Sequence, residues 1–183
     1  RQFHCIISIC RVPAVAIARD FMSRILYMLI GPKGSGKTHI GTVVDRHTDI
    51  HFLRVEPIWL ALVPGEDGWQ KVEAAVDDAF LTHDHVMIES LGAGEGFQDF
   101  FRAPAAKYEI KMIRVFADLD TCLERVRTRS SADHIAVSDD KAAEYNRIAA
   151  AVTYPWALEI DNNEPASDAA ILAAIGRLNT SAP

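Results

Sequence analysis

The sequence has few cysteines, and their arrangement excludes two classes of small protein. Its 183 residues include only Cys5, Cys10 and Cys122. An odd number of cysteines does not form the paired framework of a disulfide-rich domain, and none of the three has the C-x-x-C spacing of a zinc or redox site. This composition is typical of a reducing compartment, so we expect a cytoplasmic protein.

The sequence also lacks an excess of positive charge. It has 19 lysines and arginines against 25 aspartates and glutamates, which gives a net charge of −6. A net negative charge disfavours general electrostatic binding to the phosphates of nucleic acid. We therefore expect a small ligand and no nucleic-acid partner.

No uninterrupted apolar run is long enough to cross a bilayer. The apolar segment at residues 1–21 is broken at Arg11 and Pro13, and it lacks the continuous apolar centre of a secretory signal. We expect no membrane attachment. Because this segment has no helix or strand periodicity, we predict an upstream or weakly packed extension at residues 1–21, followed by one domain at residues 22–183.

The most specific pattern lies where an apolar run opens into a glycine-rich loop. Residues 25–30 read Ile-Leu-Tyr-Met-Leu-Ile, and residues 31–38 match G-x-x-x-x-G-K-T. In this phosphate-binding pattern the backbone N–H groups and the lysine hold phosphate oxygens, and the threonine hydroxyl binds Mg²⁺. An accidental glycine-rich turn would leave Lys37 and Thr38 unexplained. We expect ATP and Mg²⁺ as cofactors, and the candidate nucleotide-binding residues here are Gly31, Pro32, Lys33, Gly34, Ser35, Gly36, Lys37, Thr38 and His39.

Apolar segments of strand length alternate with helical patterns along the rest of the chain. This alternation predicts a three-layer α/β/α fold around a five-stranded parallel sheet. The expected strands are residues 25–30, 51–56, 86–90, 110–117 and 156–160. The expected helices are residues 39–44, 69–81, 118–128, 138–152 and 166–178. The glycines at residues 91–96 predict a loop that either approaches a ligand or only turns the chain.

Two carboxylates stand at expected strand ends, where ligands of parallel sheets bind. Glu89 ends the strand at residues 86–90, so we predict that it positions Mg²⁺ directly or through water. Glu56 ends the strand at residues 51–56 and is a candidate to accept a proton from, or hydrogen-bond to, a phosphoryl acceptor. For both residues, a solvated carboxylate at a strand end is the alternative.

Three arginines follow at alternate positions near the end of an expected helix. Arg125 and Arg129 are four residues apart and share a helix face, whereas Arg127 points elsewhere. Planar guanidinium groups bind phosphate oxygens and stack on purines, so the first pair is a candidate to bind an anion. A solvated basic helix end is the alternative.

From residue 25 to residue 178 the chain resembles the small P-loop kinases, which include adenylate-kinase-like and shikimate- or gluconate-kinase-like enzymes. The resemblance rests on the glycine-rich loop, on Glu124-Arg-x-x-x-Arg129, and on Glu159-Ile-Asp-Asn-Asn163 with Pro165. It implies the sheet order 2-3-1-4-5, which sets the strand of Glu89 beside the first strand.

The resemblance also implies roles for individual residues. Arg125 would stack on adenine, and Arg129 would reach the phosphates from the edge of a lid at residues 130–137. The rim of the base pocket would be formed by Asn162, Asn163 and Pro165. The chain departs from the family in its short lid, which contains no arginine, so the resemblance does not identify the acceptor. Other cations that would suit an anionic acceptor are Arg54, Arg102 and Arg114.

Together these features predict an ATP- and Mg²⁺-dependent kinase that transfers a phosphoryl group to a small-molecule or nucleotide acceptor. The catalytic residues would be Lys37, Arg129, Glu89 and Glu56, and the metal would be held by Thr38 and Glu89. The alternative is a regulatory ATPase or switch protein with no small-molecule acceptor. A guanine-binding Asn-Lys-x-Asp motif is not found, because the corresponding residues read Asp161-Asn-Asn-Glu164.

Overall fold

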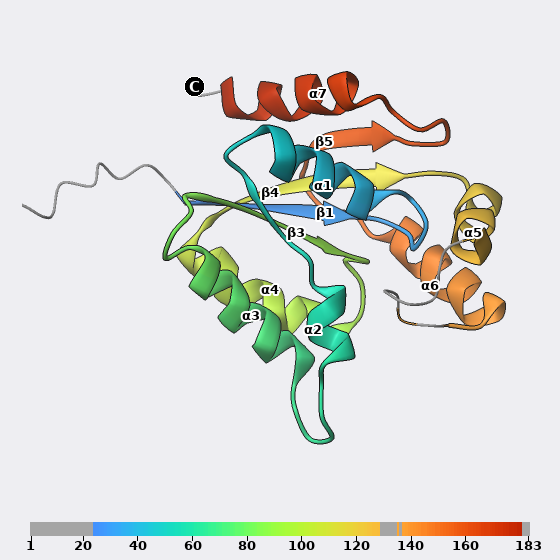
Figure 1. Cartoon of the computed structure of the whole chain (residues 1–183). Helices are drawn as coiled ribbons and strands as arrows, with labels where there is room; N and C mark the ends of the chain where they lie inside the picture. Colours follow the sequence, from blue (N-terminus) through green and yellow to red (C-terminus); the bar gives the residue numbers. More distant parts are fainter. Residues whose placement is uncertain (1–23, 129–134, 136, 181–183) are drawn as a thin grey trace, which may run out of the picture.

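The protein folds as three layers, with one parallel sheet between two sets of helices (Figure 1). The computed structural model describes residues 24–128, residue 135 and residues 137–180. The sheet has five strands in the order β2-β3-β1-β4-β5. This confirms the predicted fold class and strand order. The expected extension at residues 1–21, most of the lid and Arg129 lie outside the described residues.

All strand pairs in the sheet are parallel. The strands are β1 (Ile25–Ile30), β2 (His51–Leu53), β3 (His85–Ser90), β4 (Glu109–Phe116) and β5 (Trp156–Asp161). Every residue of β1 is buried, which explains its continuous apolar run, since a central parallel strand is covered on both faces. In the register of β1 with β3, Leu29 pairs with Glu89. That pairing brings Glu89 to the edge of the sheet where the phosphate-binding loop begins.

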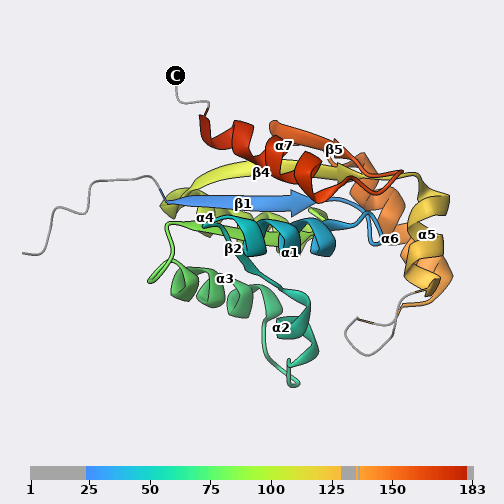
Figure 2. The same ribbon diagram turned by 45° about the horizontal axis from the view of Figure 1, so that its top comes forward.

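The helices cover both faces of the sheet. They are α1 (Lys37–His47), α2 (Glu56–Leu60), α3 (Gly68–Ala79), α4 (Glu95–Lys107), α5 (Leu119–Thr128), α6 (Asp139–Ala151) and α7 (Asp168–Thr180). Figure 1 shows α1 and α7 on one face and α3 and α4 on the other. Each pair contributes to its own apolar cluster against the sheet. Figure 2 shows α5 and α6 beyond the carboxyl ends of the strands, beside the loop that follows β1.

The first of two differences from the sequence prediction changes the place of Glu56. The strand expected at residues 51–56 ends at Leu53, and Glu56 is the first residue of the helix α2. The prediction that Glu56 ends a strand is therefore wrong. Pro57 explains the difference, because its fixed φ and missing N–H suit the first turn of a helix.

The second difference is the helix α4, which the sequence analysis did not predict. Gly92 and Gly94 precede it, both with positive φ, and Pro104 lies inside it. Glycine and proline are ordinarily signs of a loop or a helix end. The apolar side chains of Phe97 and Phe100 nevertheless bury one face of α4 against the sheet. Burial of that face outweighs the local signals for a loop.

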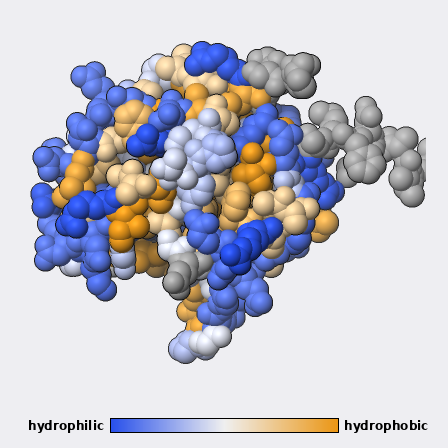
Figure 3. All heavy atoms as spheres, turned by 180° about the vertical axis from the view of Figure 1, so that it is seen from behind, coloured by the Kyte–Doolittle hydropathy of each residue, from blue (hydrophilic) through white to orange (hydrophobic). Residues whose placement is uncertain are grey.

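The surface does not present one continuous apolar region on the face shown in Figure 3, where hydrophobic residues are interspersed with hydrophilic ones. Within the part of the chain that the structure describes, no helix combines the length and the apolarity needed to cross a membrane.

Candidate active site

The loop between β1 and α1 has the backbone conformation that phosphate binding requires. Gly34 has φ +93° and Gly36 has φ +98°, a region that residues with a Cβ rarely adopt. A Cβ at Gly34 would collide with the backbone carbonyl of Cys122, and one at Gly36 would collide with the side-chain amide of Asn162. Both conformation and space therefore require glycine at these two positions.

Lys37 is the first residue of α1, directly after this loop, and is almost wholly buried. Its ammonium donates hydrogen bonds to the carbonyl oxygens of Gly31, at 2.7 Å, and Pro32, at 2.8 Å. A buried ammonium must be hydrogen-bonded, and these bonds hold it at the inner wall of the loop. The cation is thus in place to meet a phosphate group that enters the loop.

Thr38 and Glu89 meet at the start of α1. The Thr38 hydroxyl donates to Glu89 Oε2 at 2.7 Å, and the Glu89 side chain is 7% exposed. The other carboxylate oxygen, Oε1, is buried without a hydrogen-bond partner among the described residues. Hydroxyl and carboxylate oxygens are ligands that Mg²⁺ prefers, and a cation or its water would satisfy this oxygen. The pair therefore fits the predicted metal site.

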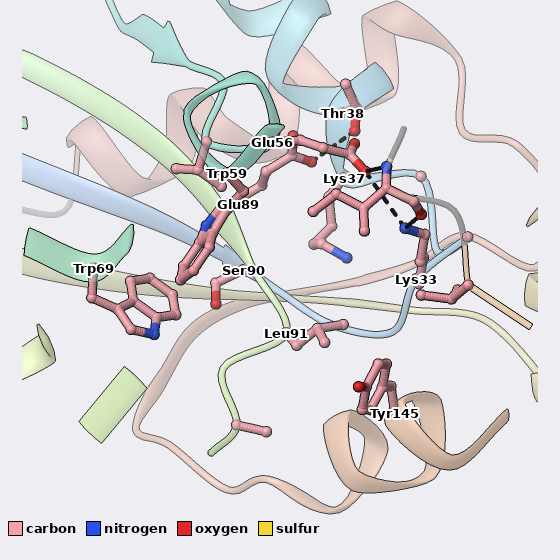
Figure 4. Close-up of a pocket in the computed structure, with 16 residues that line it drawn as sticks. Lys33, Lys37, Thr38, Glu56, Trp59, Trp69, Glu89, Ser90, Leu91 and Tyr145 are labelled. Carbon is pink, nitrogen blue, oxygen red and sulfur yellow. Dashed lines mark hydrogen bonds and ion pairs between the residues drawn. The ribbon is translucent and has the colours of Figure 1, made fainter. Parts of the chain in front are cut away.

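Glu56 is held over the phosphate-binding loop by contacts from two other segments (Figure 4). Its Oε1 accepts a hydrogen bond from the backbone N–H of Ile135 at 2.8 Å and lies 3.5 Å from Lys33 Nζ. Lys33 Nζ also donates to the Ile135 carbonyl oxygen at 2.7 Å. Ile135, the phosphate-binding loop and α2 thus meet at one carboxylate, although Glu56 is not at a strand end.

The backbone of Lys33 is fixed by a residue that the sequence analysis missed. Its N–H donates to Asn146 Oδ1 at 2.7 Å, and Asn146 Nδ2 donates to its carbonyl oxygen at 2.8 Å. Asn146 is on α6 and is fully buried. A polar residue in a helix is ordinarily exposed, so nothing in the sequence distinguished this one.

The residues expected at the base pocket are brought together on another side of the loop. Asn162 Nδ2 donates to the Ser35 carbonyl oxygen at 2.7 Å, so it ties the chain after β5 to the phosphate-binding loop. The Arg125 guanidinium donates to the carbonyl oxygens of Asn162, at 2.8 Å, and Asn163, at 2.9 Å. These polar groups hold the loop in shape. His39, on α1, and Pro165, after β5, are both exposed to solvent.

A cavity of about 470 Å³ opens beside the phosphate-binding loop, below Glu56 and Glu89 (Figure 4). Besides the loop and the two carboxylates, it is lined by Val55, Trp59, Trp69, Ser90, Leu91, Ala93, Ile135, Val137 and Tyr145. The three aromatic residues come from α2, α3 and α6, and the sequence analysis assigned them no role. Two of the chain's three tryptophans lie between β2 and β3. That clustering was the only feature of the sequence that could have indicated an aromatic cavity wall.

The tryptophans of the cavity wall are packed in a wider aromatic cluster. The rings of Trp59 and Trp69 meet edge to face with centroids 5.2 Å apart, and Trp69 stacks on Phe100 at 4.7 Å. Asp67 caps α3 by accepting a hydrogen bond from the N–H of Trp69 at 2.8 Å. These contacts fix the two indole rings, so the wall has a defined shape.

Tyr154 fixes the loop that forms another part of this wall. Its hydroxyl donates to the Gly92 carbonyl oxygen at 2.6 Å and accepts from Gln98 Nε2 at 2.8 Å. Burial raises the pKa of the Tyr154 hydroxyl above its ordinary value, which keeps it protonated as a donor. The adjacent Leu91 and Ala93 are thereby held at the edge of the cavity.

No protein-family model matches this chain, and no curated protein matches its sequence. Solved structures do match. The chain is 16% identical, with a TM-score of 0.61, to a chain in the structure of the Pnkp1/Rnl/Hen1 RNA repair complex, and the match covers 74% of this chain and 47% of that chain. This chain therefore spans about half the length of that protein.

Two further structures match over nearly their whole length. The APS kinase of Mycobacterium tuberculosis in complex with AMPPNP and APS is 14% identical with a TM-score of 0.59, and the match covers 87% of this chain and 99% of that one. The shikimate kinase from Acinetobacter baumannii in complex with shikimate is 16% identical with a TM-score of 0.53, and the match covers 86% and 92%. At these identities the likeness shows the P-loop α/β fold.

Proposed function

We propose that this protein is an ATP- and Mg²⁺-dependent kinase that transfers the γ-phosphoryl group of ATP to a hydroxyl group of a small molecule. The observation that carries the proposal is the Glu56 carboxylate, held against the phosphate-binding loop at the wall of a cavity of small-molecule size. Structures of similar fold include an APS kinase and a shikimate kinase, which supports the same reaction class.

The phosphate-binding loop would hold the nucleotide by its phosphates. Its backbone N–H groups and the Lys37 ammonium would bind the phosphate oxygens, and Thr38 and Glu89 would hold Mg²⁺. When bound, the metal would neutralise charge on the β- and γ-phosphates. Asn162 and Arg125 would act mainly by keeping the loop and the chain after β5 in place, since their polar groups bond to the protein itself.

Glu56 would act on the acceptor. Its carboxylate would accept the proton of the acceptor hydroxyl as the hydroxyl oxygen attacks the γ-phosphorus. A new bond would form between that oxygen and phosphorus, and the bond from the γ-phosphorus to the β,γ-bridging oxygen would break. The products would be the phosphorylated acceptor and ADP. Positioning and charge neutralisation supply most of the rate in this chemistry.

The direct test is transfer of labelled phosphate from γ-labelled ATP, with Mg²⁺, to pooled acceptors. One pool contains nucleoside monophosphates, and others contain sugars, hydroxy acids and aromatic alcohols. The Lys37→Ala variant serves as the blank. Label that enters one pool and depends on Lys37 would support a kinase. ATP binding with slow hydrolysis at the same rate in every pool would contradict it and favour a regulatory ATPase.

Replacement of Glu89 by glutamine is expected to raise the Mg²⁺ concentration needed for half-maximal activity by about 10- to 100-fold. The amide keeps an oxygen for the Thr38 hydroxyl but removes the negative charge beside the metal. The measurement is a Mg²⁺ titration of initial rates at saturating ATP. Glu73→Gln, a change on the outer side of α3 beside Lys107, is the matched control. An unchanged Mg²⁺ requirement in Glu89→Gln would exclude Glu89 from the metal site.

A further inference from the structure

We infer that the acceptor is an uncharged alcohol with an aromatic or similarly flat apolar ring. This inference rests on the proposed function, because it concerns the acceptor half of the same cavity. Three observations carry it: the pairing of the charges that line the cavity, the aromatic residues of its walls, and the place of Glu56 relative to them.

Each charged residue that lines the cavity already has a hydrogen-bond partner within the protein. Lys37 and Glu89 belong to the phosphate and metal end, where they bond to the loop carbonyls and to Thr38. Lys33 and Glu56 face each other at 3.5 Å and share the backbone of Ile135. Among the described lining residues, no further cation stands in the acceptor half. A carboxylate or phosphate on the acceptor would lose its water without gaining a counterion, which is strongly unfavourable.

The other arginines considered for an anionic acceptor are not in the cavity wall. Arg102 forms an exposed ion pair with Asp99, and Arg114 pairs with Glu159 on β5 at 2.9 Å. Arg54 is not a lining residue. Residues 129–134 and 136, among them Arg129, lie outside the described residues. Among the residues that the structure describes, an anionic acceptor therefore finds no cation of its own in the cavity wall.

The walls of the acceptor half are aromatic and apolar. Figure 4 shows Trp59 and Trp69 together at one side of the cavity, Tyr145 apart from them, and Leu91 between. Aromatic rings offer flat surfaces that a second ring covers with little loss of conformational freedom. A polyol would instead leave hydroxyl groups against apolar walls, where they lack partners. The walls favour a ring over a chain of hydroxyl groups.

The position of Glu56 indicates where the reacting hydroxyl group of such a ring compound would lie. Glu56 and Trp59 are three residues apart on α2, so their side chains lie on neighbouring positions of one helix face. A ring packed against Trp59 would hold an attached hydroxyl toward the Glu56 carboxylate and the phosphate-binding loop. An alcohol on a short carbon arm from the ring would meet both requirements.

The test uses three acceptors that share one ring and one alcohol but differ in charge. They are 4-methylbenzyl alcohol, 4-(hydroxymethyl)benzoate and 4-(hydroxymethyl)benzylammonium. Binding to the full chain is measured by quenching of tryptophan fluorescence, with Mg²⁺ and a non-hydrolysable ATP analogue present, and transfer is measured as ADP formation. We expect the neutral alcohol to have a Kd and a kcat/KM better than those of the carboxylate by about tenfold or more, and to exceed the ammonium compound as well.

Two variants assign the effect to the cavity wall. Trp59→Leu is expected to raise the Kd of the neutral alcohol about tenfold. Phe116→Leu is the matched control, because Phe116 lies on β4 beneath the Arg114 guanidinium and does not line the cavity. Thermal denaturation establishes that each variant is folded. The comparison of the three acceptors with the unchanged protein still tests the inference where a variant does not fold.

The outcomes separate this inference from the proposed function. Equal or tighter binding of the carboxylate or the ammonium compound would overturn the inference, and so would a Kd for the neutral alcohol above about 10 mM. Lys37-dependent transfer to an anionic acceptor would also overturn it while leaving the kinase function in place. Tight binding of the neutral alcohol without transfer to any pool would support the cavity's preference and contradict the kinase function.

Discussion

Replacement of Glu56 by glutamine is expected to lower kcat for phosphoryl transfer by about 10²- to 10⁴-fold, the range ordinarily lost with a general base. The KM for ATP is expected to stay nearly unchanged, because the residues expected to surround the base, Asn162 and Asn163, do not line the cavity that Glu56 lines. The measurement is steady-state kinetics with the acceptor found in the pooled assay, together with a binding titration of ATP.

Glutamine is the informative change because it keeps the local structure. Its amide oxygen can still accept the hydrogen bond from the Ile135 N–H, so that contact is kept, but it cannot take up a proton. Glu66→Gln is the control, since Glu66 pairs with Lys71 outside the cavity. A raised KM for the acceptor with kcat unchanged would show that Glu56 only binds the acceptor.

The conformation of the loop between β1 and α1 could be predicted from the sequence because its requirements are local. Gly34 and Gly36 adopt a backbone that only glycine accommodates easily, and Lys37 and Thr38 follow at fixed spacing. The sheet order could also be predicted, because the resemblance to the small P-loop kinases implied it. The place of Glu89 beside the loop followed from that order.

The aromatic wall of the cavity could not be predicted in the same way because it depends on packing between distant segments. Trp59 and Trp69 are held in place by packing against each other, and Trp69 also packs against Phe100. Tyr145 is on α6, far from both in the sequence, and lines the same cavity. The buried amide of Asn146 has the sequence context of an exposed helical residue. The start of α2 at Glu56 was also missed, because the apolar pattern before it predicted a strand, whereas Pro57 favours the first turn of a helix.

Replacement of Lys37 by alanine is expected to lower kcat/KM for ATP by about 10²- to 10³-fold or more. The lysine is the cation that the structure holds inside the phosphate-binding loop, and it would meet charge that develops on the transferred group. Its loss should act on the chemical step as well as on binding, since negative charge builds up on the β,γ-bridging oxygen as its bond to the γ-phosphorus breaks.

The fold is expected to survive this change. The ammonium donates to the carbonyl oxygens of Gly31 and Pro32 in one loop at the edge of the sheet, so its loss leaves the strand pairing and the two apolar clusters in place. Because both residues are buried, the loss of this donor should lower the free energy of unfolding by roughly 1–3 kcal/mol, a shift of several degrees in the melting temperature.

Lys71→Ala is the control, since that lysine is half exposed and pairs with Glu66. Kinetics and calorimetry on the same samples would distinguish a catalytic from a structural role. A large fall in melting temperature would show that Lys37 maintains the loop. Undiminished transfer in a folded Lys37→Ala protein would instead show that the loop does not hold the reacting phosphate, and the proposed reaction would have to take place elsewhere on the molecule.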